Sequence, residues 1–190
     1  TAFIADRSAG LQIIDVSVPL FPTRRSVYNT SSQAYGVALS TDGNTAFVGD
    51  GSHGLDIINI SDLGNPSLRG NYNTSGSARD VAISADGNTA FVADDDGGLQ
   101  IVNISNLNSP TLRGSFDTSS YALGLSLSAD GDTVYLADDA NGLQIINVSD
   151  LSSPSLINTF STSGDAIDVA LSSDGATAYV ADGSSGLQII

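Results

Sequence analysis

The chain has 190 residues, of which 41% are hydrophobic, and this apolar content excludes intrinsic disorder. All 21 acidic residues are Asp and all 6 basic residues are Arg, so the net charge is −15, which argues against binding to nucleic acid or to an anionic membrane surface. Cysteine is absent, which excludes a disulfide framework, and no apolar run is long enough to insert into a membrane.

The first apolar segment, Thr1–Asp6, recurs four times at a constant spacing of 44 residues. Gly-Leu pairs, Asp-Gly pairs, a proline and an aromatic residue keep the same spacing along the chain. A fixed period of this length is the signature of a repeat architecture. We therefore predict one repeat array over residues 1–190, with units 1–44, 45–88, 89–132, 133–176 and a partial unit 177–190. Because both ends fall inside apolar segments, we expect the chain to be a fragment of a longer one.

Residues 79–118 illustrate the elements that one unit predicts. Short apolar runs alternate with turn signals such as Asp86-Gly87, which is typical of antiparallel hairpins. The four predicted strands are Asp80–Ser84, Thr89–Ala93, Leu99–Ile104 and Thr111–Phe116. The fourth is more polar than the others and suits an outer edge. The fold class is therefore all-β, with tandem four-stranded antiparallel blades of 44 residues.

The third strand of each unit is almost continuously apolar, which indicates a sheet that is covered on both faces. Stacked blades of a β-propeller, or an open propeller-like array, provide that covering. Compared with a complete unit, the chain begins at a second strand and ends at a third. Three arrangements remain open: an excerpt of a larger closed ring, a window on a long array or fibre, or an unstable fragment with exposed edges.

Three segments, Gly10–Ser17, Gly98–Ser105 and Gly142–Ser149, together with Pro110 and Pro154, resemble LVIVD repeats. The resemblance covers the whole chain. It implies a β-propeller of the kind found in bacterial and archaeal surface or secreted proteins. It implies no catalytic activity and supplies no catalytic residues.

The densest acidic clusters are candidate calcium ligands, since Ca²⁺ prefers carboxylate oxygens. The candidates are Asp94, Asp95, Asp96, Asp138 and Asp139. The spacing does not match an EF-hand loop, and no Glu closes it. The alternative is a polar hairpin turn whose Asp side chains bond to turn amides. Calcium is the only cofactor that these residues suggest.

An Asp follows the second strand of every unit, at positions 6, 50, 94, 138 and 182. These carboxylates could bind a cation or anchor the following loop by hydrogen bonds, and we favour the anchoring role because a residue that recurs in every unit usually serves the repeat. His53 is the only histidine and lies in a Gly/Ser loop, which is typical of an exposed residue. With no Cys, Lys or Glu in the chain, we expect no catalytic residues and no enzymatic activity.

The function that the sequence favours is an extracellular structural or adhesive repeat protein. Its blades would form a scaffold or fibre through self-association with neighbouring repeats. The alternative is a cell-surface binding propeller that recognises a protein or glycan partner through its rim loops. A third hypothesis, which the residue types favour least, is an enzyme domain, since propellers can host active sites. The first two place the protein outside the cell or on its surface, with no nucleic acid and no membrane insertion.

Overall fold

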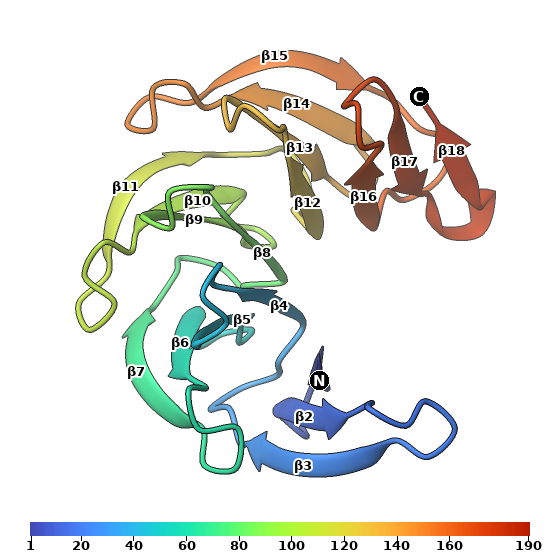
Figure 1. Ribbon diagram of the computed structural model, residues 1–190. Helices are drawn as coiled ribbons and strands as arrows, with labels where there is room; N and C mark the ends of the chain where they lie inside the picture. The colour runs from blue at the N-terminus through green and yellow to red at the C-terminus, as the bar shows by residue number, and fades with distance from the viewer.

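The computed structural model describes all 190 residues as five antiparallel sheets that fan around a common axis in an open arc (Figure 1). We number these sheets as blades 1 to 5. Blade 1 contains β1–β3, blade 2 β4–β7, blade 3 β8–β11, blade 4 β12–β15 and blade 5 β16–β18. The arrangement is that of a β-propeller, so the predicted all-β class and the four-stranded blades are confirmed.

Each blade places its strands at equivalent distances from the axis. The inner strands are β4 (Gly36–Leu39), β8 (Asp80–Ile83), β12 (Gly124–Leu127) and β16 (Asp168–Leu171). The second strands are β1 (Ala2–Ala5), β5 (Thr45–Gly49), β9 (Thr89–Ala93), β13 (Thr133–Ala137) and β17 (Ala178–Ala181).

The remaining strands lie farther from the axis. The third strands are β2 (Leu11–Asp15), β6 (Leu55–Asn59), β10 (Leu99–Asn103), β14 (Leu143–Asn147) and β18 (Leu187–Ile189). The outer strands are β3 (Thr23–Tyr28), β7 (Ser67–Tyr72), β11 (Thr111–Phe116) and β15 (Ser155–Phe160). The single helical element is the 3-10 turn η1 (Gly183–Ser185), and no helix of the chain is long and apolar enough to cross a membrane.

The strands predicted for residues 79–118 are confirmed, and only β8 and β10 end one residue earlier than expected. The outer strands are the most exposed, as their polar sequences predict. Each 44-residue unit of sequence supplies three strands to one blade and the inner strand to the next, so covalent continuity runs across every blade boundary.

The hydrophobic core lies between the blades. Four clusters of buried apolar side chains fill the four boundaries between successive blades. At the boundary of blades 2 and 3, Phe47, Leu55 and Ile57 of one sheet pack against Val92 and Val102 of the next. Each buried side chain of this size contributes about 1.5–3 kcal/mol. Blades 2, 3 and 4 have a neighbour on each side and thus bury both faces of their sheets, which explains the almost continuously apolar third strands.

Backbone hydrogen bonds also join neighbouring blades. The Asp95 N–H donates to the Ala122 carbonyl and the Ala122 N–H donates back, both at 3.0 Å. The same bridge links Arg7 to Ala34, Gly51 to Ala78 and Asp139 to Ala166. It ties the turn between the second and third strands to the segment that enters the next inner strand. We call the blade ends that carry these two segments the upper rim, and the opposite ends the lower rim.

Candidate functional site

The recurring Asp residues at 50, 94, 138 and 182 are fully buried on the upper rim. Asp50 accepts the backbone N–H of Ser31 at 2.9 Å and that of Ser32 at 3.0 Å. In blade 5, Asp182 accepts the equivalent N–H of Gly164 at 3.0 Å. Asp50 and Asp182 therefore have the expected structural role, but the segment that they anchor precedes the blade in sequence, whereas we expected the following loop. Asp138 does bond to the following turn, through the Asn141 amide, and Asp6 is exposed.

The three carboxylates of residues 94–96 have different partners. Asp94 accepts a hydrogen bond from the Thr74 hydroxyl, and burial raises the pKa of Asp94 above its usual value. Asp95 instead pairs with the Arg79 guanidinium, whose Nε lies 2.7 Å from Oδ2. Asp96 is exposed. The three side chains thus do not form one ligand set, and calcium binding by this turn stays a prediction.

The second predicted calcium pair is also divided. Asp138 is buried and accepts a hydrogen bond from the Asn141 amide at 3.0 Å. Asp139 is half-buried, with the Ser120 hydroxyl 3.3 Å from its Oδ2. Asp139 lines a pocket near the propeller axis, whereas Asp138 does not.

This pocket lies on the upper rim and has a volume of about 510 Å³. We call it the axial mouth, because its walls come from the starts of the inner strands and from the turns beside them. Its charged lining residues are Arg7, Arg79, Asp80, Asp139, Asp165 and Asp168. They combine hydrogen-bond donors and acceptors in one cavity.

One repeat position that lines the axial mouth differs in every blade. The residue before each inner strand is Tyr35, Arg79, Leu123 or Ile167, four different types at one repeat position. The core positions of the same blades keep their apolar character throughout. This position therefore differs from blade to blade at the surface of the pocket, where packing does not restrict the side chain.

Backbone strain points to the same place. Arg7, Asp95 and Asp139 occupy equivalent turn positions with φ of 44°, 52° and 47°, and glycine stands at the equivalents Gly51 and Gly183. A side chain in this left-handed region costs about 1–2 kcal/mol. Strained residues of this kind are frequent at functional sites. Two of the three line the axial mouth, and the third pairs with a residue that does.

Arg79 is held in a fixed orientation. Its guanidinium carbon lies 4.3 Å from the centroid of the Tyr35 ring, and Asp95 accepts a charged hydrogen bond from it. Arg7 lies 5.0 Å from the same ring centroid. Stacking on an aromatic face and pairing with a carboxylate together restrict the side chain. A preorganised cation thus stands at the wall of the axial mouth.

Glycine and aspartate alternate at the first residue of the inner strands. Asp80 accepts the Leu125 N–H at 3.0 Å, and burial raises the pKa of Asp80. A Cβ on Gly36 would lie 2.6 Å from Asp80 Oδ1, and one on Gly124 would lie 2.6 Å from the Oδ1 of Asp168. Each Asp therefore requires a glycine in the preceding blade.

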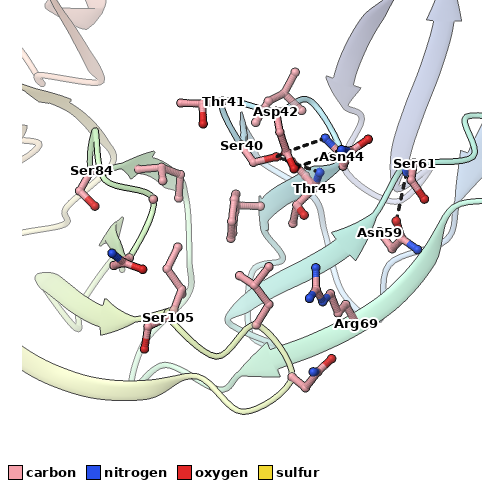
Figure 2. Close-up of a pocket in the computed structure, with 18 of the residues that line it drawn as sticks. Ser40, Thr41, Asp42, Asn44, Thr45, Asn59, Ser61, Arg69, Ser84 and Ser105 are labelled. Carbon is pink, nitrogen blue, oxygen red and sulfur yellow. Dashed lines mark hydrogen bonds between the residues drawn. The ribbon is translucent and has the colours of Figure 1, made fainter.

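A larger cavity of about 890 Å³ lies between blades 2 and 3 on the lower rim (Figure 2). The polar side chains that line this cavity make their hydrogen bonds to residues of the same turn. Asp42 accepts the Ser40 hydroxyl at 2.5 Å and the Asn44 N–H at 3.0 Å, and the Ser40 hydroxyl in particular lowers the Asp42 pKa to about 2. Ser84, Asp86 and Asn88 repeat this arrangement in blade 3. We therefore attribute this cavity to the repeat itself.

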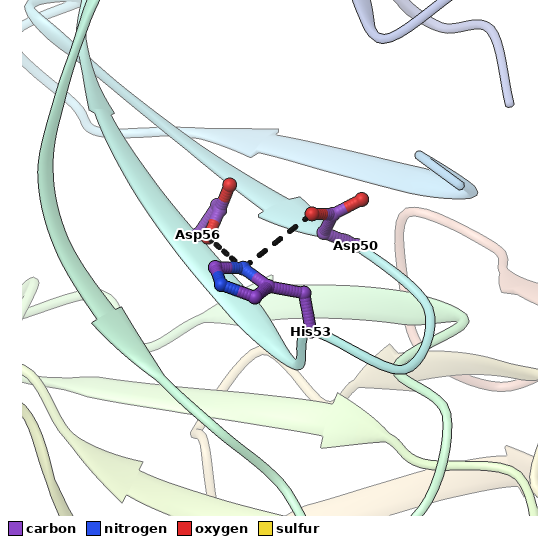
Figure 3. A group of neighbouring side chains, drawn as sticks. All are labelled: Asp50, His53 and Asp56. Atoms are coloured by element: carbon purple, nitrogen blue, oxygen red, sulfur yellow. Dashed lines mark hydrogen bonds and ion pairs between the residues drawn. The ribbon is translucent and has the colours of Figure 1, made fainter. Parts of the chain in front are cut away.

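His53 has neighbours that its sequence context did not indicate (Figure 3). Its Nδ1 lies 3.0 Å from Asp56 Oδ1 and 3.5 Å from Asp50 Oδ2. The side chain is 37% exposed, so the expected exposure is partial, and the two neighbouring carboxylates were not expected. The missed signal was Asp56, which stands where every other unit has Gln. Burial is the main cause that raises the Asp56 pKa.

Comparison with solved structures shows the same fold in proteins of different names. Periplasmic gluconolactonase of Pseudomonas aeruginosa matches 98% of this chain at 18% identity with a TM-score of 0.81. A Bacteroides uniformis protein named a 6-phosphogluconolactonase matches 94% at 14% identity with a TM-score of 0.80. The β-propeller domain of Myceliophteria thermophila Cps50 (Swd1) matches 98% at 15% identity with a TM-score of 0.74. The chain spans 60–63% of the length of these structures.

These matches correct one expectation. We excluded enzymatic activity because the chain has no Cys, Lys or Glu. That exclusion is wrong, because chains with this arrangement of blades bear the names of lactonases. At identities of 14–18% the likeness shows the fold, which is one that enzymes use. Asp and Arg, both present in the axial mouth, are sufficient for acid–base and electrostatic chemistry.

Comparison with curated protein sequences gives no match. The family model described as the LVIVD repeat matches five times, at residues 2–30, 33–74, 75–118, 124–162 and 163–190. Each match covers the strands of one blade, and together they span almost the whole chain. The chain therefore belongs to the LVIVD-repeat family, as the resemblance of its sequence implied.

Proposed function

We propose that this chain is part of a β-propeller that binds a small hydroxyl-rich ligand, of the sugar or sugar-lactone class, at the axial mouth. The observation that carries the proposal is the concentration of strained, charged and non-repeating residues in that one pocket. The core of the blades follows the repeat. Residues that bind a ligand are expected at positions that do not repeat, since the repeated positions serve packing and turn formation.

The chemistry of the lining supports this ligand class. Asp139, Asp165 and Asp168 supply carboxylate oxygens that accept hydrogen bonds from hydroxyl groups. Arg7 and Arg79 supply donors for a carbonyl or carboxylate oxygen. Carboxylates and guanidinium groups together also suit lactone hydrolysis, in which a carboxylate activates water and a cation stabilises the developing oxyanion. Two similar structures carry lactonase names.

The test is calorimetric titration with a sugar lactone and with its hydrolysed acid, together with measurement of lactone hydrolysis above the spontaneous rate. Asp139→Asn keeps a residue that tolerates the turn conformation but removes the charge. We expect it to weaken binding by about tenfold, the difference between a charged and a neutral hydrogen bond. Asp150→Asn, exposed on the lower rim, is the matched control and should bind like the wild type. Equal binding by both variants, or no binding by the wild type, contradicts the proposal.

A second candidate is an extracellular or cell-surface scaffold or adhesive array. It is favoured by the identical connections between successive blades, because one bridge and one type of apolar cluster recur at each boundary. Units that join in the same way can extend by repetition. Electron microscopy of the native material tests it: filaments with a repeating density support the array, whereas discrete rings contradict it. Labelling of intact cells with a membrane-impermeant reagent tests the location.

A further inference from the structure

The upper rim of blade 2 departs from the other four blades at one buried position. Asp56 stands where the equivalent residues are Gln12, Gln100, Gln144 and Gln188. Three of these glutamines close the adjacent turn by donating to its carbonyl: Gln12 to Ala9 at 2.5 Å, Gln100 to Gly97 at 2.7 Å and Gln188 to Ser185 at 3.4 Å. A carboxylate has no N–H and cannot make this bond.

In blade 2 the missing donor comes from the outer strand. Asn71 on β7 donates through Nδ2 to the His53 carbonyl at 2.9 Å, which closes the turn. The same Nδ2 lies 2.9 Å from Asp56 Oδ1. The equivalents of Asn71 in the other outer strands are Val27, Ser115 and Thr159. Asp56 is thus released from the structural role that its position has elsewhere, and Asn71 holds its carboxylate in place.

A cation beside the Asp56 carboxylate would stabilise it. Its side chain is 0% exposed, and its Oδ2 has no hydrogen-bond partner. A buried carboxylate with an unsatisfied oxygen is costly unless a positive charge lies beside it. Asp138 and Asp182 also have one unpartnered oxygen each, but neither has a histidine and a second carboxylate within reach. The complete ligand set occurs in blade 2 alone.

The spacing of the donor atoms fits a small ion. One donor atom from each of Asp50, His53 and Asp56 lies within 4.8 Å of the other two. Two of the separations are 3.0 and 3.5 Å. A tetrahedral ion with bonds of about 2.0–2.2 Å places its ligand atoms about 3.3–3.6 Å apart, so the 3.5 Å separation already fits and the 3.0 Å separation has to lengthen by a few tenths of an ångström. Figure 3 shows the imidazole ring between the two carboxylates, with His53 Nδ1 facing both.

We propose that Asp50, His53 and Asp56 bind one divalent transition-metal ion of the zinc class. One imidazole nitrogen and two carboxylate oxygens suit Zn²⁺, and three protein ligands leave a fourth position for water or a ligand. His53 is 37% exposed, so solvent reaches the imidazole side of the cluster, whereas both carboxylates are buried. The Ser31 and Ser32 N–H groups orient Asp50, and Asn71 orients Asp56, as outer-shell donors do at metal sites.

The test is calorimetric titration of the chelator-treated chain with zinc chloride. We expect one zinc ion per chain. Asp56→Gln and His53→Ala introduce residues that stand at the same positions in other blades, so both variants should fold. Each should weaken zinc binding at least ~100-fold, because loss of an outer-shell partner alone costs about 10–100-fold. Asp96→Asn, an exposed carboxylate on the equivalent turn of blade 3, is the control for general attraction to an acidic surface and should bind like the wild type.

The single histidine gives an independent readout. Zinc should shift the imidazole NMR resonances of His53 in the wild type and leave those of Asp56→Gln unchanged. Thermal unfolding of the zinc-free variants verifies that they are folded. The proposal is overturned if the wild type shows no saturable zinc binding, or if Asp56→Gln and His53→Ala bind zinc as the wild type does. In either case Asp50, His53 and Asp56 form a hydrogen-bonded cluster and not a metal site.

Discussion

Blades 2 and 3 have the same strand plan and the same pairing between second and third strands, yet their upper rims differ. Phe47 of one and Phe91 of the other occupy equivalent core positions. At the turn, His53 and Asp56 of blade 2 replace Gly97 and Gln100 of blade 3. In both blades a side chain donates to the turn carbonyl, but the donor is Asn71 in one and Gln100 in the other. Ionisable residues can therefore replace Gly and Gln at this turn without a change in the strands of the blade.

The largest expected effect comes from the core, where the two blades should behave alike. Phe47→Ala and Phe91→Ala each remove a ring that is at most 2% exposed. Each should lower the free energy of unfolding by about 3–5 kcal/mol, through lost burial and the cavity that remains. Urea denaturation measures both. A much smaller loss in blade 2 than in blade 3 would show that the two boundaries are not equivalent.

The next effect separates two glycines of blade 3. Gly98 has a φ of +67°, and a Cβ there would lie 2.4 Å from the Phe116 carbonyl oxygen. Gly98→Ala should cost about 3 kcal/mol, from backbone strain and overpacking together. Gly87 has a φ of +71° but open space around it, so Gly87→Ala should cost about 1 kcal/mol. Similar losses for both, measured by urea unfolding, would show that the close approach to Phe116 is relaxed in solution.

The third prediction transfers the blade 2 turn into blade 3. Gln100→Asp removes the donor to the Gly97 carbonyl and buries a carboxylate, so it should cost about 1–3 kcal/mol at neutral pH. Adding Ser115→Asn, which reproduces Asn71, should recover part of that loss. The reverse change, Asp56→Gln, should leave the unfolding free energy within about 1 kcal/mol. If the double variant is no more stable than Gln100→Asp alone, Asn71 is not the substitute donor.

The smallest effect is a pH profile with two opposite slopes. Burial raises the pKa of Asp56, Asp80, Asp94 and Asp138 in the folded chain above the usual value of 3.8. Because the folded state then binds protons more readily than the unfolded state, these groups should make the chain more stable as the pH falls from 7 toward 3.8.

Below that pH the slope should reverse. Turn hydrogen bonds lower the pKa of Asp42 and Asp86 to about 2, so the stability that they contribute is lost as the pH falls from 3.8 through 2. Urea unfolding midpoints across this range measure the profile. In Asp56→Gln the rise above pH 3.8 should be shallower, because one buried carboxylate is gone. A profile that falls steadily from pH 7 would contradict this assignment.

Much of the blade could be predicted from the sequence, because its causes are local. Alternating apolar runs and Asp-Gly turns predicted the strands, and the almost continuous apolar third strand predicted that both faces are covered. The recurring Asp was correctly given a structural role. The partners of Asp50 were not predicted, because the N–H groups that it anchors lie 18 and 19 residues earlier in the chain and meet Asp50 only in the folded blade.

The candidate sites were largely missed. The acidic composition of the turn at 94–96 led to its prediction as a calcium site, but its carboxylates point to separate partners. Catalysis was excluded from residue types that the chain lacks, although Asp and Arg are sufficient when a fold brings them together. His53 and Asp56 are three residues apart, so their proximity was accessible from the repeat: one unit alone replaces its Gln.

The sequence by itself determined the repeat, the strands, the turns and the apolar faces, because each depends on neighbours within a few residues or on the period of the pattern. The tertiary structure alone decided which polar side chains meet. The axial mouth joins Arg7, Arg79, Asp139 and Asp168, which lie on four blades. Their convergence follows from the stacking of sheets around an axis, and no local pattern specifies which positions of a blade face that axis.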